Sequence, residues 1–71
     1  SSVSVAPESV KTYDEKAVIV RIRADSVLRR RKDDCRVKVE SMTGKLSDEE
    51  FTRLLEKAKV KVSDTGVLYV E

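Results

Sequence analysis

The stretch that most constrains the fold runs from Lys16 to Arg23, where apolar and charged residues alternate. Val18, Val20 and Ile22 recur at every second position, so in an extended chain they would share one side of a sheet. The two arginines of the stretch would lie on the opposite side. The pattern therefore predicts a strand with an apolar face that needs a covering element and a cationic face that needs a partner.

A second segment, Cys35 to Glu40, repeats this alternation and predicts the other strand of a hairpin. Its cysteine and two valines would lie on the apolar side, and its charged residues on the other side. The intervening residues, Ala24 to Asp34, are too many for a tight turn, and they include the basic run Arg29 to Lys32. We expect this run to form a cationic tip next to the cationic face.

The clearest local signal is the start of a helix at Ser47. Ser47 and Glu50 have the spacing of a capping box, and Leu46 and Phe51 have the spacing of a hydrophobic staple. Apolar residues then follow at i, i+3, i+4 and i+7, so one stripe of the helix can cover the apolar side of the hairpin. That stripe consists of Phe51, Leu54, Leu55 and Ala58.

Alternation returns at residues 59–62 and 67–70, on either side of Ser63 to Gly66. The glycine of this short connection permits the positive φ angle that closes a hairpin. The complete order predicts an α+β fold of two layers, ββαββ, with a mainly antiparallel sheet of about four strands and one helix on one face. The same order also fits a β-grasp topology.

Seventy-one residues suffice for one domain with a small core, since a chain of this size buries only about 60% of the surface that it exposes when unfolded. We expect this domain over residues 17–71. Residues 1–16, which contain Pro7, fit neither a strand nor a helix for long and are expected to form an N-terminal arm or the end of a linker. The small core also favours a homodimer through a strand edge.

The composition argues against an enzyme. The chain has no histidine, no glycine-rich phosphate loop and one cysteine, Cys35, which lies on the predicted core side. The acids Asp48 to Glu50 are explained by the positive end of the predicted helix, and Asp33 and Asp34 balance the adjacent basic run. We therefore expect no catalytic site, no metal site and no cofactor.

The cysteine count and the amide content indicate the cellular location and the temperature at which the protein works. A single cysteine excludes an intrachain disulfide framework and favours a reducing, intracellular location. No run of apolar residues is long enough to cross a bilayer. The absence of asparagine and glutamine, beside 39% charged residues, is the pattern expected of proteins from hot environments.

The distribution of charge indicates where a partner would bind. Residues 17–46 carry nine basic and four acidic side chains. If the predicted strand faces hold, one surface gathers nine cations, and such a surface suits the phosphates of a nucleic acid. These cations are Arg21, Arg23, Arg29, Arg30, Arg31, Lys32, Arg36, Lys38 and Lys61.

The leading hypothesis is a non-enzymatic domain that contacts the backbone of DNA or RNA without reading its sequence, because the basic face lacks an aromatic platform for base stacking. An alternative is a protein-interaction or oligomerisation module of β-grasp type, in which the cations meet an acidic protein surface. A third interpretation is that the cations only solvate the exposed side of an antiparallel sheet.

Overall fold

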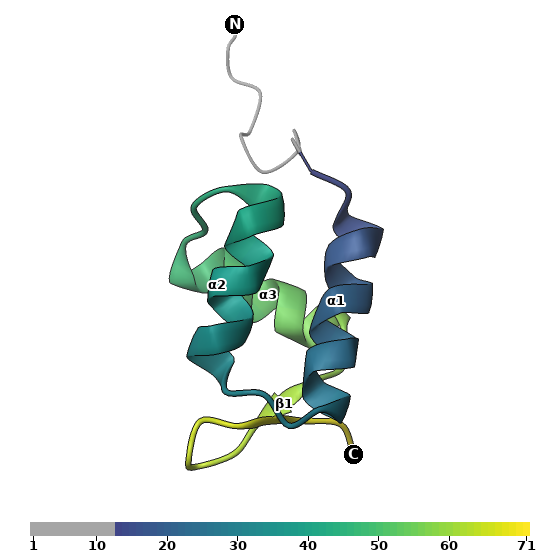
Figure 1. Cartoon of the computed structure of the whole chain (residues 1–71), viewed down its shortest axis with the longest axis vertical. Coiled ribbons are helices and arrows are strands. Elements are labelled where there is room, and N and C mark those ends of the chain that lie inside the picture. Colours follow the sequence, from purple (N-terminus) through teal and green to yellow (C-terminus); the bar gives the residue numbers. More distant parts are fainter. Residues whose placement is uncertain (1–12) are drawn as a thin grey trace, which may run out of the picture.

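The computed structural model describes residues 13–71, which form three helices followed by one hairpin (Figure 1). The four-stranded sheet predicted from the sequence is wrong, and with it the ββαββ order and the β-grasp topology. In the described range the sheet has two antiparallel strands, with Lys61 opposite Tyr69 and Val62 opposite Leu68. The elements are α1 (Glu15–Val27), α2 (Lys32–Thr43), α3 (Asp48–Lys57), β1 (Lys61–Val62) and β2 (Leu68–Tyr69).

Helix α1 occupies the stretch for which alternation predicts a strand. Val18 and Ile22 are fully buried, whereas Val20 is 67% exposed. Residues four apart share a face in a strand and also in a helix, so the positions of Val18 and Ile22 are compatible with either element. Only Val20 distinguishes the two, because it would share their face in a strand but not in a helix. The Asp14 side chain caps the helix by accepting hydrogen bonds from two first-turn backbone nitrogens, at 3.1 and 3.3 Å. This cap is the sequence signal that the strand interpretation missed.

Helix α2 replaces the second predicted strand for the same reason. Cys35 and Val39, four residues apart, are fully buried, while Val37 between them is 68% exposed. Two acids in the first turn, Asp33 and Asp34, complement the positive end of the helix dipole. The long loop predicted over residues 24–34 is correspondingly wrong, because α1 and α2 leave only residues 28–31 between them.

The predicted helix start at Ser47 is confirmed. The Ser47 hydroxyl accepts a hydrogen bond from the backbone nitrogen of Glu50 at 3.1 Å, and the predicted apolar stripe is buried. The second predicted hairpin is also present, although its paired strands are short. Gly66 has a φ angle of 83°, and the backbone nitrogen of Ser63 donates to the carbonyl oxygen of Val67 at 2.9 Å.

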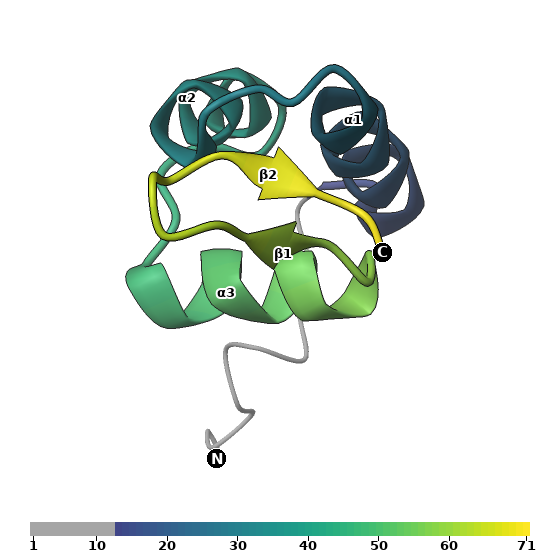
Figure 2. The same ribbon diagram turned by 90° about the horizontal axis from the view of Figure 1, so that it is seen from below.

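Helices α1 and α2 run side by side in opposite directions, and α3 crosses them (Figure 1). Seen from below, the hairpin lies between α3 and the adjoining ends of α1 and α2 (Figure 2). Two backbone hydrogen bonds attach it there, from Lys32 to the carbonyl oxygen of Gly66 at 2.8 Å and from Leu68 to that of Arg30 at 2.9 Å. A short turn at residues 44–47, which contains Gly44, joins α2 to α3, so the two helices have the connectivity of a helix-turn-helix, and the hairpin follows α3 as a wing would.

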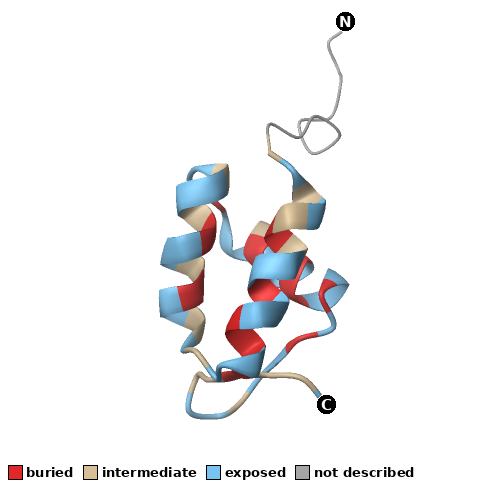
Figure 3. Cartoon of the chain, turned by 45° about the vertical axis from the view of Figure 1, so that its right-hand side comes forward, coloured by how far each residue is buried: buried red, intermediate tan, exposed pale blue. Residues whose placement is uncertain are grey.

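The core lies where the three helices meet, and buried residues line their inward sides (Figure 3). Leu68 of β2 joins this core and ties the hairpin to the helices. The burial of Cys35 confirms its predicted place on the core side. The buried apolar residues are Val18, Ile22, Cys35, Val39, Leu46, Phe51, Leu54, Leu55, Ala58, Val60 and Leu68.

Two further sequence predictions concern the N-terminal arm and the membrane. Of the predicted arm, residues 1–16, residues 1–12 lie outside the described residues, and Glu15 and Lys16 belong to α1. Among the described helices, none is both long and apolar enough to cross a membrane.

Candidate functional site

The nine cations predicted to bind nucleic acid do not share one face, because the segments that would align them as strands are helices. Two project from α1, four lie in or beside the loop between α1 and α2, two project from α2 and one lies on β1. In that order they are Arg21 and Arg23; Arg29, Arg30, Arg31 and Lys32; Arg36 and Lys38; and Lys61.

Four of these arginines make internal contacts, and the first three are Arg21, Arg23 and Arg30. Nη1 of Arg23 donates to the carbonyl oxygen of Ala58 at 2.6 Å, so α1 supplies a cation to the C-terminal end of α3. Nε of Arg30 donates to Oδ1 of Asp25 at 3.0 Å, and Nη1 of Arg21 lies 3.9 Å from the same oxygen. These contacts occupy some of the donors of the three guanidinium groups and leave the others accessible.

Arg36 joins α2 to the start of α3. It donates to Oε2 of Glu40 at 3.4 Å and to Oδ1 of Asp48 at 2.6 Å. It also donates to the carbonyl oxygen of Leu46, and its guanidinium lies 5.6 Å from the centroid of the Phe51 ring. Arg36 lowers the pKa of Asp48, whereas the backbone N–H of Leu46 is the main cause that lowers the pKa of Glu40, with a further contribution from Arg36.

Asp25 is a carboxylate with no exposed surface, and it lies beside the buried thiol of Cys35. Burial, followed by the neighbouring Asp25 carboxylate, raises the pKa of Cys35 to about 12. A thiol with such a pKa stays protonated at neutral pH and is a poor nucleophile. Over residues 13–71 no group of three or more acidic or cysteine side chains could hold a metal ion. The buried pair of Asp25 and Cys35 is therefore structural.

Most of the remaining cations lie where the hairpin meets the loop between α1 and α2. Arg29, Arg31 and Lys32 have no ion-pair partner within residues 13–71, and Arg31 forms a backbone bridge to the hairpin. Lys61 lies on the hairpin itself and is also unpaired among the described residues. We call these four residues the basic end. Lys38 is exposed on α2 and lies outside this group.

The outward face of α3 is acidic. A shallow depression on this face has a volume of about 420 Å³ and is lined by three carboxylates, one arginine and one threonine. This charge opposes the approach of a phosphate group. The lining residues are Asp48, Glu49, Thr52, Arg53 and Glu56.

Helix α1 has a second apolar face on the side opposite the core. Val20 and Val27 of the helix and Leu28, its C-cap, are 67%, 74% and 64% exposed, and Ala24 lies between them on the same side. We call these four residues the α1 outer strip. The water-facing side of a helix in a small domain normally carries polar residues, so this strip is a candidate docking surface.

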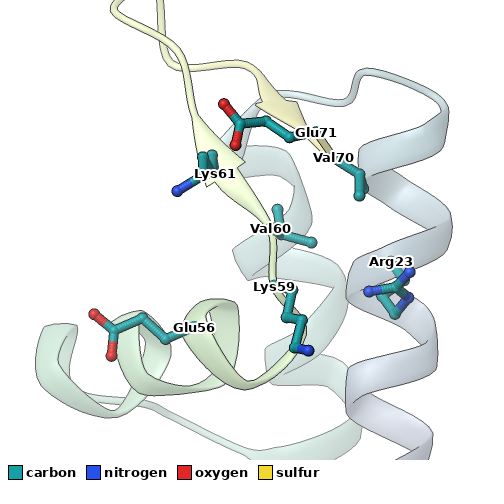
Figure 4. Close-up of a pocket in the computed structure, with 7 residues that line it drawn as sticks. All are labelled: Arg23, Glu56, Lys59, Val60, Lys61, Val70 and Glu71. Atoms are coloured by element: carbon teal, nitrogen blue, oxygen red, sulfur yellow. The ribbon is translucent and has the colours of Figure 1, made fainter.

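A hollow of about 490 Å³ opens between α1, the end of α3 and the hairpin (Figure 4). It contains three cations, two carboxylates and two valines. Arg23 connects it to the α1 outer strip, because Arg23 lies three residues from Val20 and four from Val27 on the helix surface. The lining residues are Arg23, Glu56, Lys59, Val60, Lys61, Val70 and Glu71.

Comparison of the chain with protein-family models, with curated proteins and with solved structures found no match. The geometry of the described residues is therefore the basis for assigning a function. Its two candidate surfaces are the α1 outer strip with the adjoining hollow, and the basic end, and Lys61 belongs to both the hollow and the basic end.

Proposed function

We propose that the chain is a non-enzymatic protein-binding domain and that its partner docks on the α1 outer strip. The observation that carries this proposal is the burial pattern of α1, in which Val18 and Ile22 are fully buried while Val20 and Val27 are 67% and 74% exposed. A helix that is apolar on both sides has more hydrophobic surface than the domain core uses. Covering the second side is favourable by about 1–2 kcal/mol for each Val or Leu side chain, since each is only about two thirds exposed before binding.

The acidic face of α3 supports a protein partner rather than duplex DNA. In DNA-binding helix-turn-helix proteins, the second helix of the motif enters the major groove with its N-terminal residues against the bases. The corresponding turn here carries Asp48, Glu49 and Glu50, whose carboxylates would repel the DNA phosphates. The helix-turn-helix topology alone therefore does not imply that the chain reads DNA.

An amphipathic model peptide, with a leucine stripe and glutamine flanks, tests this proposal. Its titration into the ¹⁵N-labelled protein should shift the amide signals of the α1 outer strip, and the double variant Val20→Glu/Val27→Glu should abolish these shifts. Val37→Glu is the matched control, because Val37 is 68% exposed but lies on α2. Binding that survives in the double variant, or that is lost in the control, would contradict the proposal.

A second candidate function is contact with the backbone of a nucleic acid through the basic end. It is favoured by four cations that have no ion-pair partner within residues 13–71. Four phosphate contacts on duplex DNA would give a log–log dependence of affinity on salt with a slope of about −3.6. The variant Arg31→Ala/Lys32→Ala should reduce this slope to about −1.8. No binding of a duplex at low salt would reject this function.

A further inference from the structure

Resting on the proposed function, we infer that the partner segment is an amphipathic helix with acidic residues beside its apolar stripe. The α1 outer strip has cationic borders, because Arg23 is the surface neighbour of both Val20 and Val27, and Arg21 lies on the other side. Asp25, the acid nearest to them on α1, is fully buried. An apolar stripe with cationic borders complements an apolar stripe with acidic borders.

The arginines beside the strip retain donors for a partner. The side chain of Arg21 is 48% exposed, and its nearest carboxylate oxygen, on Asp25, is 3.9 Å away. Arg23 uses Nη1 for the carbonyl oxygen of Ala58, which leaves its other nitrogens for a second acceptor. A carboxylate that reaches either arginine forms a charge-assisted hydrogen bond, which is about twice as strong as a neutral one.

The hollow next to Arg23 extends the cationic border, because its three cations outnumber its two carboxylates, Glu56 and Glu71. Lys59 lines the same hollow, and in Figure 4 it lies between Arg23 and Glu56, nearer to Arg23. Val60 and Val70 supply apolar surface for the methylene groups of an incoming glutamate. A partner helix on the α1 outer strip therefore places the acidic side chains of one flank at this hollow.

A second copy of the chain fits the strip less well than an acidic partner does. In an antiparallel pair of α1 helices, the two-fold axis passes near the middle of the strip. Arg21 and Arg23 lie close to that middle and would face their own copies across the axis. Like charges at such a contact cost affinity, whereas the same arginines attract carboxylates.

Three model peptides of equal length and identical leucine stripe, with glutamate, glutamine or lysine flanks, test the inference. The glutamate peptide should bind the α1 outer strip about tenfold more tightly than the glutamine peptide, and the difference should shrink as salt is raised, because exposed charges are screened. Fluorescence anisotropy gives the affinities, and amide shifts give the location. Equal affinities of the glutamate and glutamine peptides at the strip would overturn the acidic partner while leaving the docking surface intact. Binding of all three peptides elsewhere would overturn both.

Charge reversal provides the second arm of this test. The double variant Arg21→Glu/Lys59→Glu should reverse the preference, so that the lysine peptide binds more tightly than the glutamate peptide. Lys38→Glu is the control, because it reverses one exposed charge on α2, outside the α1 outer strip, and should leave the preference as it is. Circular dichroism confirms that each variant is folded. A dimer seen in sedimentation equilibrium that Val20→Glu dissociates would identify a second copy as the occupant and overturn the inference.

Discussion

At the scale of single residues, Arg36 combines several kinds of contact. It pairs with two carboxylates, on Glu40 and Asp48, donates to a carbonyl oxygen and lies over the ring of Phe51. It thereby connects α2, the turn and the first residues of α3. From the sequence, Arg36 is predicted to bind a phosphate, but its guanidinium lies between two elements of the fold itself.

This arrangement predicts a pH dependence of stability. A carboxyl whose pKa is lower in the folded state stabilises the fold above its unfolded pKa, and the stabilisation is lost as pH falls through the folded pKa. The pKa values of Glu40 and Asp48 are both lowered from their ordinary values of 4.5 and 3.8. The free energy of unfolding should therefore decrease as pH falls below about 4.5, and Arg36→Met should make this decrease shallower.

Urea unfolding followed at pH 7, 4 and 3 provides the measurement. Lys38→Met is the control, since Lys38 is exposed on the same helix and has no ion-pair partner among residues 13–71. Its pH dependence should equal that of the unaltered protein. If the pH dependence of Arg36→Met were parallel to that of the control, the ion pairs of Arg36 would not contribute to the pH dependence of stability.

At the scale of elements, the sequence predicted α3 and the hairpin but not α1 and α2. The start of α3 depends on a local cap at Ser47, and the hairpin depends on the turn that ends at Gly66, so neither needs tertiary information. The two missed helices have buried residues four apart, which fit a strand and a helix equally well. Because α1 was predicted as a strand, which would place Val20 in the core, the α1 outer strip was not predicted either.

The sequence also did not predict which side chains contact one another. Nothing in the spacing of Arg23 and Ala58, 35 residues apart, indicates that one caps the other. The nine predicted cations all occur in the described residues, but their pairing depends on how the helices cross. The charge composition therefore identified the candidate side chains, but it did not show which of them form ion pairs or hydrogen bonds within the domain.

The turn between α2 and α3 gives a prediction at this scale. Gly44 has φ 85° and ψ −172°, a region that essentially only glycine occupies. A Cβ added there would meet nothing within 4 Å, so Gly44→Ala tests backbone strain without a clash. It should lower the free energy of unfolding by about 1–3 kcal/mol.

The adjacent substitution Lys45→Ala is the control for Gly44→Ala. It alters the same turn at an exposed position and should change the free energy of unfolding by less than about 0.5 kcal/mol. Chemical denaturation of the two variants gives both values. Equal effects of the two substitutions would contradict the role assigned to the glycine conformation.

At the scale of the whole molecule, one helix serves two purposes. The inner side of α1 contributes Val18 and Ile22 to the core, and its outer side retains apolar residues that the described fold leaves uncovered. The core is small, so the stability of the whole domain depends on each buried side chain. The outer strip adds nothing to that core, which is why we assign it to a partner.

The most direct test of this account is the same substitution made at two valines on α1. We expect Val18→Ala to lower the free energy of unfolding by about 2 kcal/mol, from lost burial and the cavity left behind. Val20→Ala should change it by less than about 0.5 kcal/mol, because Val20 is 67% exposed. Equal losses at Val18 and Val20 would place both side chains in the core, as in a strand, and would contradict both the helix and its outer docking surface.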